Sequence, residues 1–167
     1  MEVGVAAPLS APAAPDTPAL PVHIEAIAVS KRFGGASGVL ALDDVSLCVR
    51  QREFVSILGP SGCGKSTLLR CVAGLERCSA GTIRVEGQIV RDPPAKLGMV
   101  FQRDVLLEWR SILDNLFLPI DLRRQSRKPY VARAHELLAL FGLDGFERAY
   151  PAQLSGGMRQ RAAICRA

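Results

Sequence analysis

Gly59, Gly64, Lys65 and Ser66 have the residue types and spacing of a phosphate-binding loop. They lie in the stretch LGPSGCGKST, residues 58–67, which matches G-x-x-x-x-G-K-S/T. Glycines let the backbone turn tightly, so that successive N–H groups point inward at phosphate oxygens, and a helix beginning at Lys65 adds its positive end. The pattern predicts that Lys65 contacts the β- and γ-phosphates of a nucleotide and that the Ser66 hydroxyl is a ligand of Mg²⁺.

The sequence also contains the two elements that must position this loop. The apolar run before it, FVSIL, is typical of a strand, and the run after it, KSTLLRCVAGL, is typical of a helix. We therefore expect the whole loop to surround the nucleotide, including its remaining members, Pro60, Ser61, Gly62, Cys63 and Thr67. Cys63 is expected to be a small filler whose thiol has no role. The alternative is a glycine-rich turn without a ligand.

A second candidate anion site lies in PAQLSGGMRQRAAICRA, residues 151–167. Ser155 is typical of a helix N-cap, and Gly156 and Gly157 leave backbone amides uncovered at the positive end of the helix dipole. An anion can bind at such a helix end. Taken alone, the stretch favours an ordinary junction between a loop and a helix.

The order of the apolar runs predicts an α/β domain. Residues 1–21 are rich in alanine and proline and are expected to be a flexible lead-in, so the domain is expected to span residues 22–167. We expect a mixed sheet, with a small antiparallel β subdomain and a helical insertion at about 103–155. Strands are expected at 22–29, 45–50, 53–59, 81–87 and 96–102, and helices at 65–75, 111–124 and 129–142.

Composition argues against several classes of protein. With 167 residues, 49% hydrophobic and 22% charged, the chain has the make-up of a globular domain. No apolar run approaches the ~18 residues of a membrane span, and the first basic residue is Lys31, which argues against a signal peptide. The five cysteines form no C-x-x-C pair, so we expect reduced thiols and no zinc site.

The net charge of +5 raises the question of a nucleic-acid partner. Basic residues concentrate in DLRRQSRKPYVAR, residues 121–133, which has no aromatic residue apart from Tyr130. The pattern indicates one helix ending and another beginning at Lys128-Pro129. We interpret the stretch as a solvated helical surface and do not expect a nucleic-acid partner. Its basic residues are Arg123, Arg124, Arg127, Lys128 and Arg133.

Three short motifs, together with the phosphate loop, resemble those of one family. LSGGM, residues 154–158, is followed by Arg-Gln-Arg and is similar to a signature motif; VFQ, ending at Gln102, is similar to a Q-loop. KRFGG, with Phe33, resembles an aromatic segment that stacks on adenine, although Phe33 could equally be an apolar anchor. These motifs identify the chain, from about Val22 to Ala167, as similar to the ATP-binding subunit of ABC transporters, with the α/β P-loop NTPase fold.

The resemblance implies how these residues would work. Two ATP-binding subunits of the family form a head-to-tail dimer, so Ser155 and the amides of Gly156 and Gly157 would grip the γ-phosphate of the partner's ATP. Lys65 and Gln102 would be the catalytic residues, and Gln102 would also ligate Mg²⁺ or hold the attacking water. The alternative for Gln102 is a polar residue at the end of a strand.

The resemblance also implies partners at a membrane. The stretch RDVLLEWRSILDNL, residues 103–116, would receive transmembrane permease subunits, and a periplasmic or extracellular solute-binding protein would act indirectly. The intact protein would then be an importer ATPase at the cytoplasmic face of the cell membrane. LLEW and ILDN are most similar to importers of the nitrate, sulfonate and taurine type, although Glu108 stands where proline is expected. Trp109 could equally belong to the core.

Residues that the family needs for turnover are not found in the sequence. No apolar strand ending in Asp-Glu follows the signature, and His23 and His135 both precede it. Asp43 and Asp44 follow an apolar run but precede the phosphate loop, so we reject them. The resemblance implies that the C-terminal third of the domain is missing and that the chain alone does not hydrolyse ATP. The alternatives are a soluble ABC ATPase acting on nucleic acid or ribosomes, and a nucleotide-binding fragment without turnover.

Overall fold

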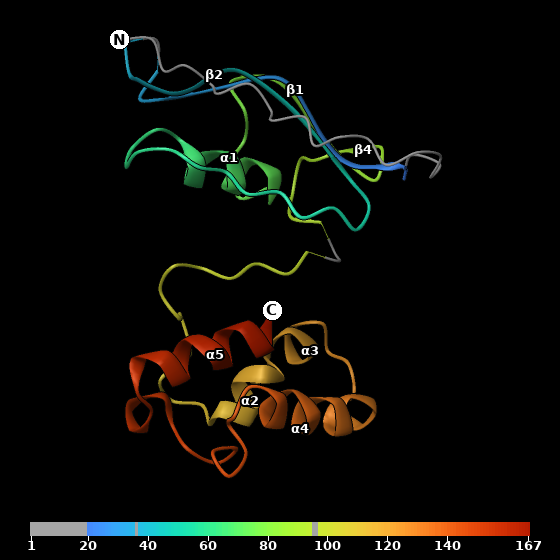
Figure 1. The fold of residues 1–167 in the computed structure, drawn as a ribbon, viewed down its shortest axis with the longest axis vertical. Helices are drawn as coiled ribbons and strands as arrows, with labels where there is room; N and C mark the ends of the chain where they lie inside the picture. Colours follow the sequence, from blue (N-terminus) through green and yellow to red (C-terminus); the bar gives the residue numbers. More distant parts are fainter. Residues whose placement is uncertain (1–19, 36, 95–96) are drawn as a thin grey trace, which may run out of the picture. The chain divides into compact units, whose positions relative to one another are not determined.

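The computed structural model describes residues 20–35, 37–94 and 97–167 and divides the chain into two compact units. The first unit ends at Leu97 and the second begins at Gly98. The described part of the first unit is a sheet with one helix, and that of the second is helical (Figure 1). Most of the expected lead-in, residues 1–19, lies outside the described residues.

Four antiparallel strands form the sheet of the first unit, in the order β2-β1-β3-β4. The long β1 pairs with β2 from Val22–Arg50 at one end to Phe33–Val39 at the other. A two-residue turn joins β3 to β4 with positive φ at Glu86 and Gly87, as expected for a hairpin that follows the twist of the strands. The strands are β1 (Val22–Phe33), β2 (Val39–Arg50), β3 (Ala80–Val85) and β4 (Gln88–Ile89).

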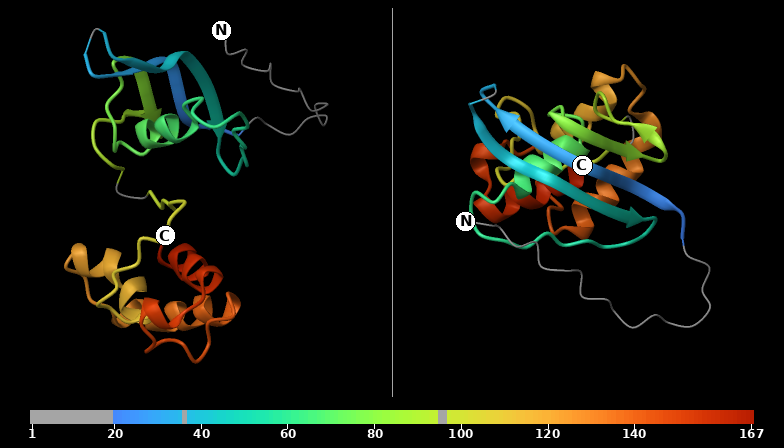
Figure 2. Two further views of the ribbon diagram at one scale, coloured as in Figure 1. Left: turned by 90° about the vertical axis from the view of Figure 1, so that its left-hand side faces the viewer. Right: turned by 90° about the horizontal axis from the view of Figure 1, so that it is seen from above.

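Helix α1 (Lys65–Val72) packs on one face of this sheet, as the views in Figures 1 and 2 show. Its buried residues are Leu68 and Cys71, which lie three positions apart and therefore share one side of the helix. They form a core with side chains from three of the strands. The other buried members of that core are Ala26, Val29, Leu42 and Ile83.

Two of the expected strands, 53–59 and 96–102, are not strands in the described residues. The first is extended and exposed, with 93% of Phe54 and 88% of Leu58 accessible to solvent. A strand needs a neighbour that pairs with its N–H and C=O groups, and no described segment pairs with either stretch. The described sheet is therefore antiparallel throughout, and the expectation of a mixed sheet is wrong for these residues.

The second unit has its own apolar core. Ile112, Leu138, Leu143 and Ala162 are completely buried in it. The helical pattern expected from 111 to 142 is confirmed, with a break where Pro119, which has no N–H, lies in the first turn of a new helix. The elements are α2 (Ile112–Leu116), α3 (Leu118–Leu122), η1 (Lys128–Tyr130), α4 (Val131–Leu140), η2 (Pro151–Gln153) and α5 (Gly156–Arg166).

Gly81 provides a test of the packing between β3 and β1. Its φ is 78°, and a Cβ there would lie 2.2 Å from the Ala28 carbonyl oxygen, whereas Gly87 has the same φ of 78° and open space around it. We predict that Gly87→Ala costs about 1 kcal/mol of unfolding free energy through backbone strain alone, and that Gly81→Ala costs at least about 3 kcal/mol. Urea unfolding followed by far-UV circular dichroism measures both, and equal costs would contradict the register at Ala28.

Candidate functional site

The phosphate loop leads directly into α1, and Gly64 fixes the junction. Gly64 is the N-cap of α1 and has a φ of 94°, and a Cβ there would lie 2.3 Å from the Ala41 carbonyl oxygen of β2. Gly62 also has a positive φ, of 83°. At position 64, only glycine can adopt the positive φ and fit this close to the Ala41 carbonyl oxygen without strain. The expected start of the helix at Lys65 is confirmed, so the amides of its first turn are directed into the loop.

The Lys65 side chain folds back over the loop. Its Nζ donates hydrogen bonds to the carbonyl oxygens of Gly59, at 2.7 Å, and Pro60, at 2.6 Å, and lies 3.4 Å from the Cys63 Sγ. The ammonium charge is therefore held within the loop. Cys63 has more contact than the filler expected from the sequence, because its sulfur also lies 2.7 Å from where a Cβ on Gly59 would be.

Phe33 lies at the end of the sheet that also contacts the phosphate loop. It is the last residue of β1 and pairs with Val39, two residues before Ala41, which lies against Gly64. Its side chain is 39% exposed, and the Lys31 Nζ lies 4.7 Å from the centre of its ring. The ring therefore has accessible surface, although the Lys31 ammonium lies over it, and its role as an adenine platform stays a prediction.

Ser155 is the N-cap of α5, as the sequence predicts. Its backbone is extended, with φ −64° and ψ 159°, and its Oγ accepts a hydrogen bond from the Met158 N–H at 3.3 Å. Gly156 and Gly157 begin the helix and are exposed, so their amides are open to an anion. The capping role of Ser155 is confirmed, whereas binding of γ-phosphate stays a prediction.

Gln102 lies in a bend and not at the end of a strand, which corrects the expected strand-to-helix boundary. The reason is again that residues 97–101 find no strand partner in the described part of the chain. Gln102 and Gly156 nevertheless line one polar cavity of about 370 Å³ in the second unit. The structure thus brings the predicted Q-loop glutamine close to the start of the signature helix.

An ion pair that sequence reasoning missed connects these two motifs. The Arg159 Nε lies 2.9 Å from the Asp104 Oδ2, and the Arg159 Nη1 donates to the Leu154 carbonyl oxygen at 2.7 Å. Arg166 donates to the Val105 carbonyl oxygen at 2.8 Å, so α5 contacts the segment after Gln102 twice. The Arg-Gln-Arg that follows the signature was the only signal of this contact in the sequence.

Trp109 lies on the surface of the second unit. It is 74% exposed, which excludes a place in the core of this unit. Glu108 and Trp109 are the central residues of a β-turn closed by a 3.1 Å hydrogen bond from the Arg110 N–H to the Leu107 carbonyl oxygen. The turn lies in the stretch expected to receive a membrane partner.

Arg127, which belongs to the basic stretch, is engaged within the unit. Its Nε and Nη2 lie 2.8 and 2.6 Å from the two carboxylate oxygens of Asp121, and its Nη1 lies 2.7 Å from the Asp114 Oδ1. Arg110 reaches the same Asp121 carboxylate at 2.7 Å. Hydrogen bonds from Arg127 and then Arg110 lower the pKa of Asp121 to about 2. Arg127 therefore stabilises the helical unit.

All five cysteines are free thiols, and they range from the exposed Cys48 to the buried Cys71. Cys71 is buried in the core beneath the sheet, and burial, with a hydrogen bond to Cys78, raises the pKa of its thiol to about 11. Cys71 is therefore protonated near neutral pH. In the described ranges, no group of three or more histidine, cysteine, aspartate or glutamate side chains is placed to hold a metal.

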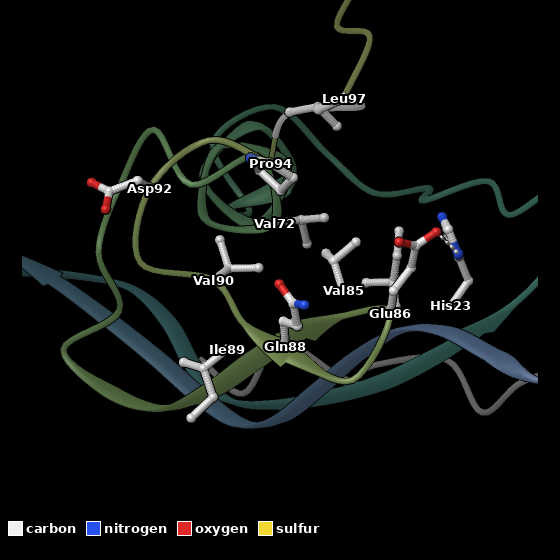
Figure 3. A pocket seen from close by; sticks show the side chains of 11 residues that line it. His23, Val72, Val85, Glu86, Gln88, Ile89, Val90, Asp92, Pro94 and Leu97 are labelled. Atoms are coloured by element: carbon white, nitrogen blue, oxygen red, sulfur yellow. Dashed lines mark ion pairs between the residues drawn. The ribbon is translucent and has the colours of Figure 1, made fainter.

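A cavity of about 300 Å³ in the first unit holds none of the predicted site residues (Figure 3). It lies between the β3–β4 hairpin and the end of α1, where Val72, Val85 and Val90 supply apolar lining. Figure 3 shows Glu86 beside His23 at one end and Asp92 at the other. The two carboxylates repel a phosphate chain and the aliphatic walls offer it no hydrogen bonds, so the cavity is a poor nucleotide site.

Fold and loop together define a P-loop nucleotide-binding protein. Residues 42–167 match the family described as ABC transporter, and the chain belongs to that family. Several curated relatives and solved structures are similar over most of the chain.

Several of the relatives are named as import ATP-binding proteins. The taurine import ATP-binding protein TauB of Rhizobium johnstonii is 47% identical, over 89% of this chain and 56% of its own length. The nitrate import ATP-binding protein NrtD of Synechocystis is 42% identical, over 87% of this chain and 55% of its own length. The chain therefore spans about half the length of the curated relatives it matches.

A solved structure of the ATP-binding cassette MJ0796 has a closely similar fold. That protein is a dimer in a post-hydrolysis state bound to ADP and Pi. Its TM-score is 0.76 and its sequence identity 33%, covering 86% of this chain and 68% of that one. The chain thus has the fold of an ABC ATPase cassette.

The Asp121 cluster predicts how stability depends on pH. Because the folded-state pKa of Asp121, about 2, lies below its ordinary value of 3.8, its contribution is present above about pH 4 and is lost as the pH falls toward 2. Arg127→Leu should lower stability at pH 7 and flatten this loss between pH 4 and 2. Urea unfolding followed by far-UV circular dichroism measures it. The control is Arg133→Leu, which removes an exposed pair with Glu136 and should leave the loss unchanged.

Proposed function

We propose that this chain is the nucleotide-binding part of an ATPase that powers an ABC-type membrane importer. The observation that carries the proposal is the pair of open helix N-termini: α1 behind the phosphate loop, and α5 behind Ser155. Each directs unpaired amides at a position where an anion can bind. Family membership makes ATP the anion to test first.

The residues of the loop fit a phosphate chain. Gly64 brings the backbone against β2, Lys65 supplies a charge held by two carbonyl oxygens and the Cys63 sulfur, and Ser66 is exposed in the first turn of α1. Phosphate oxygens are stronger partners for an ammonium group than neutral carbonyls, so Lys65 would turn to them. Ser66, and Gln102 in the assembled protein, would supply oxygen ligands to Mg²⁺, which neutralises phosphate charge when bound.

The signature helix supports an assembly of two ATP-binding subunits. A γ-phosphate held between the loop of one subunit and Ser155, Gly156 and Gly157 of the other would link nucleotide binding to closure of the pair. The dimeric state of the MJ0796 cassette favours this arrangement. The nucleotide site of one chain would then be completed by the amides of another.

A membrane permease is the proposed partner of the Trp109 surface. No helix in the described parts of the chain is both long and apolar enough to cross a membrane. In the proposed importer, the ATPase would contact transmembrane subunits from the cytoplasmic face, and an exposed aromatic on an ordered turn is typical of a protein interface. The cargo is proposed as a small solute, because the relatives name taurine, nitrate, sulfate or thiosulfate, and methionine.

Lys65→Ala tests the phosphate loop. The change removes a charge-assisted contact worth roughly 1.5–3 kcal/mol, so the affinity for Mg-ATP should fall about tenfold to a hundredfold. Isothermal titration calorimetry on the 167-residue chain measures it. The matched control is Arg70→Ala, which removes one exposed positive charge from the same helix and should change the affinity little. Equal affinities for the parent chain and Lys65→Ala would exclude the loop as the nucleotide site.

Ser155→Arg tests the head-to-tail assembly. In a hydrolysis-blocked version extended with the C-terminal part of a relative, the bulky side chain should occupy the γ-phosphate position and abolish ATP-driven dimerisation. ATP binding to the monomer should remain, because the loop is untouched. Light scattering with and without ATP measures the assembly, with Ser126→Arg as the control for an added charge on an exposed loop. Dimers that survive Ser155→Arg would contradict the role of the signature.

A further inference from the structure

Asn115 of α2 is completely buried, and its side chain bonds to backbone groups of the turn that carries Trp109 and of Ser111, the N-cap that follows the turn. Its Oδ1 accepts from the Leu107 N–H at 2.8 Å. Its Nδ2 donates to the carbonyl oxygens of Leu107 and Arg110, both at 3.1 Å, and of Ser111, at 3.0 Å. An amide nitrogen has two hydrogens, so one of them is shared between two carbonyls.

These bonds hold both ends of the turn to one side chain. Leu107 is the first residue of the turn and Arg110 the last, and Asn115 reaches a carbonyl oxygen of each. Glu108 and Trp109, between them, are exposed, and Glu108 also lines the polar cavity that holds Gln102 and Gly156. These bonds fix the turn through its backbone, and the Trp109 ring remains exposed.

Two further contacts secure the position of α2 beneath the turn. The Ile112 N–H donates to the Ala149 carbonyl oxygen at 2.8 Å, and the Ser111 Oγ caps the helix by accepting from the Asp114 N–H at 3.1 Å. The Arg110 side chain reaches Asp121 of α3 at 2.7 Å. Asn115 therefore links the turn to α2, which is itself hydrogen-bonded to the segment that contains Ala149.

We infer that Asn115 is a positioning residue that keeps the Leu107–Arg110 turn in one conformation, so that Trp109 and Glu108 are presented as a rigid contact for a protein partner. The partner chemistry that fits is an apolar socket for the indole beside a positive or hydrogen-bonding group for the carboxylate. That this partner is a permease rests on the proposed function. A preorganised turn avoids the entropy cost of ordering on contact.

Amide hydrogen exchange tests the role of Asn115 in the 167-residue chain. The Leu107 N–H is bonded to Asn115 and the Arg110 N–H closes the turn, so Asn115→Leu should speed exchange at both by at least about tenfold beyond any change in global stability. Asn115→Asp is the second variant: it keeps an acceptor for the Leu107 N–H, but it replaces the donors to the three carbonyls by a carboxylate oxygen that cannot bond to them. It should keep Leu107 protected while Arg110 loses protection.

Leu138→Ala is the control for stability alone. Leu138 is completely buried in the same core, and its loss should speed exchange throughout the helical unit by a common factor. Trp109 is the only tryptophan of the chain, so its fluorescence anisotropy gives a second readout, which should fall in Asn115→Leu and not in Leu138→Ala.

Two results would overturn the inference. One is unchanged protection of the Leu107 and Arg110 amides in Asn115→Leu. The other is a loss of protection at the same two amides in Leu138→Ala that equals the loss in Asn115→Leu when the two variants have the same unfolding free energy. Mg-ATP titration of the same samples separates this inference from the proposed function. Asn115→Leu should bind Mg-ATP as the parent chain does, whereas a parent chain that does not bind it would contradict the proposed function and leave the exchange result standing.

Discussion

Every buried backbone N–H and C=O group needs a partner, and this requirement decides which parts of the chain take regular structure. The strands β1, β2 and β3 pair along their length and become the sheet under which α1 packs. Residues 53–58, equally apolar, find no pairing neighbour in the described residues and remain extended and exposed. The turn before α2 has no strand or helix to complete it, and there the Asn115 side chain supplies the missing partners.

The candidate site forms where backbone N–H groups have no hydrogen-bond partner within the described part of the chain. A helix cannot pair its own first amides, and the N-caps of α1 and α5 are the small residues Gly64 and Ser155. At α1 the backbone is held close to β2 by Gly64, and at α5 the amides follow the small cap Ser155. Unpaired amides would be costly in a core. At these two helix ends they lie at the surface in fixed positions, where a charged ligand can bind.

The sequence predicted those features of the site that depend on local chemistry. The start of a helix at Lys65 and the N-cap at Ser155 depend on nearby residues alone, and both predictions are confirmed. The strand before the loop was wrongly expected, since pairing depends on a distant segment that apolarity alone does not reveal. The contacts of Asp104 with Arg159, and of Asn115 with the Trp109 turn, were missed because they join residues through space without a repeating pattern.

The exposed segment at residues 53–58 affects how the phosphate loop responds to a ligand. On one side the loop is fixed, because α1 is packed against the sheet, while on the other it continues into Phe54–Leu58, which no described strand holds. A ligand that orders this side must overcome chain entropy as it binds, and part of its gross interaction energy is spent there. A ligand that also buries Phe54 and Leu58 would bind with a negative change in heat capacity, so its binding enthalpy would become more negative as the temperature rises.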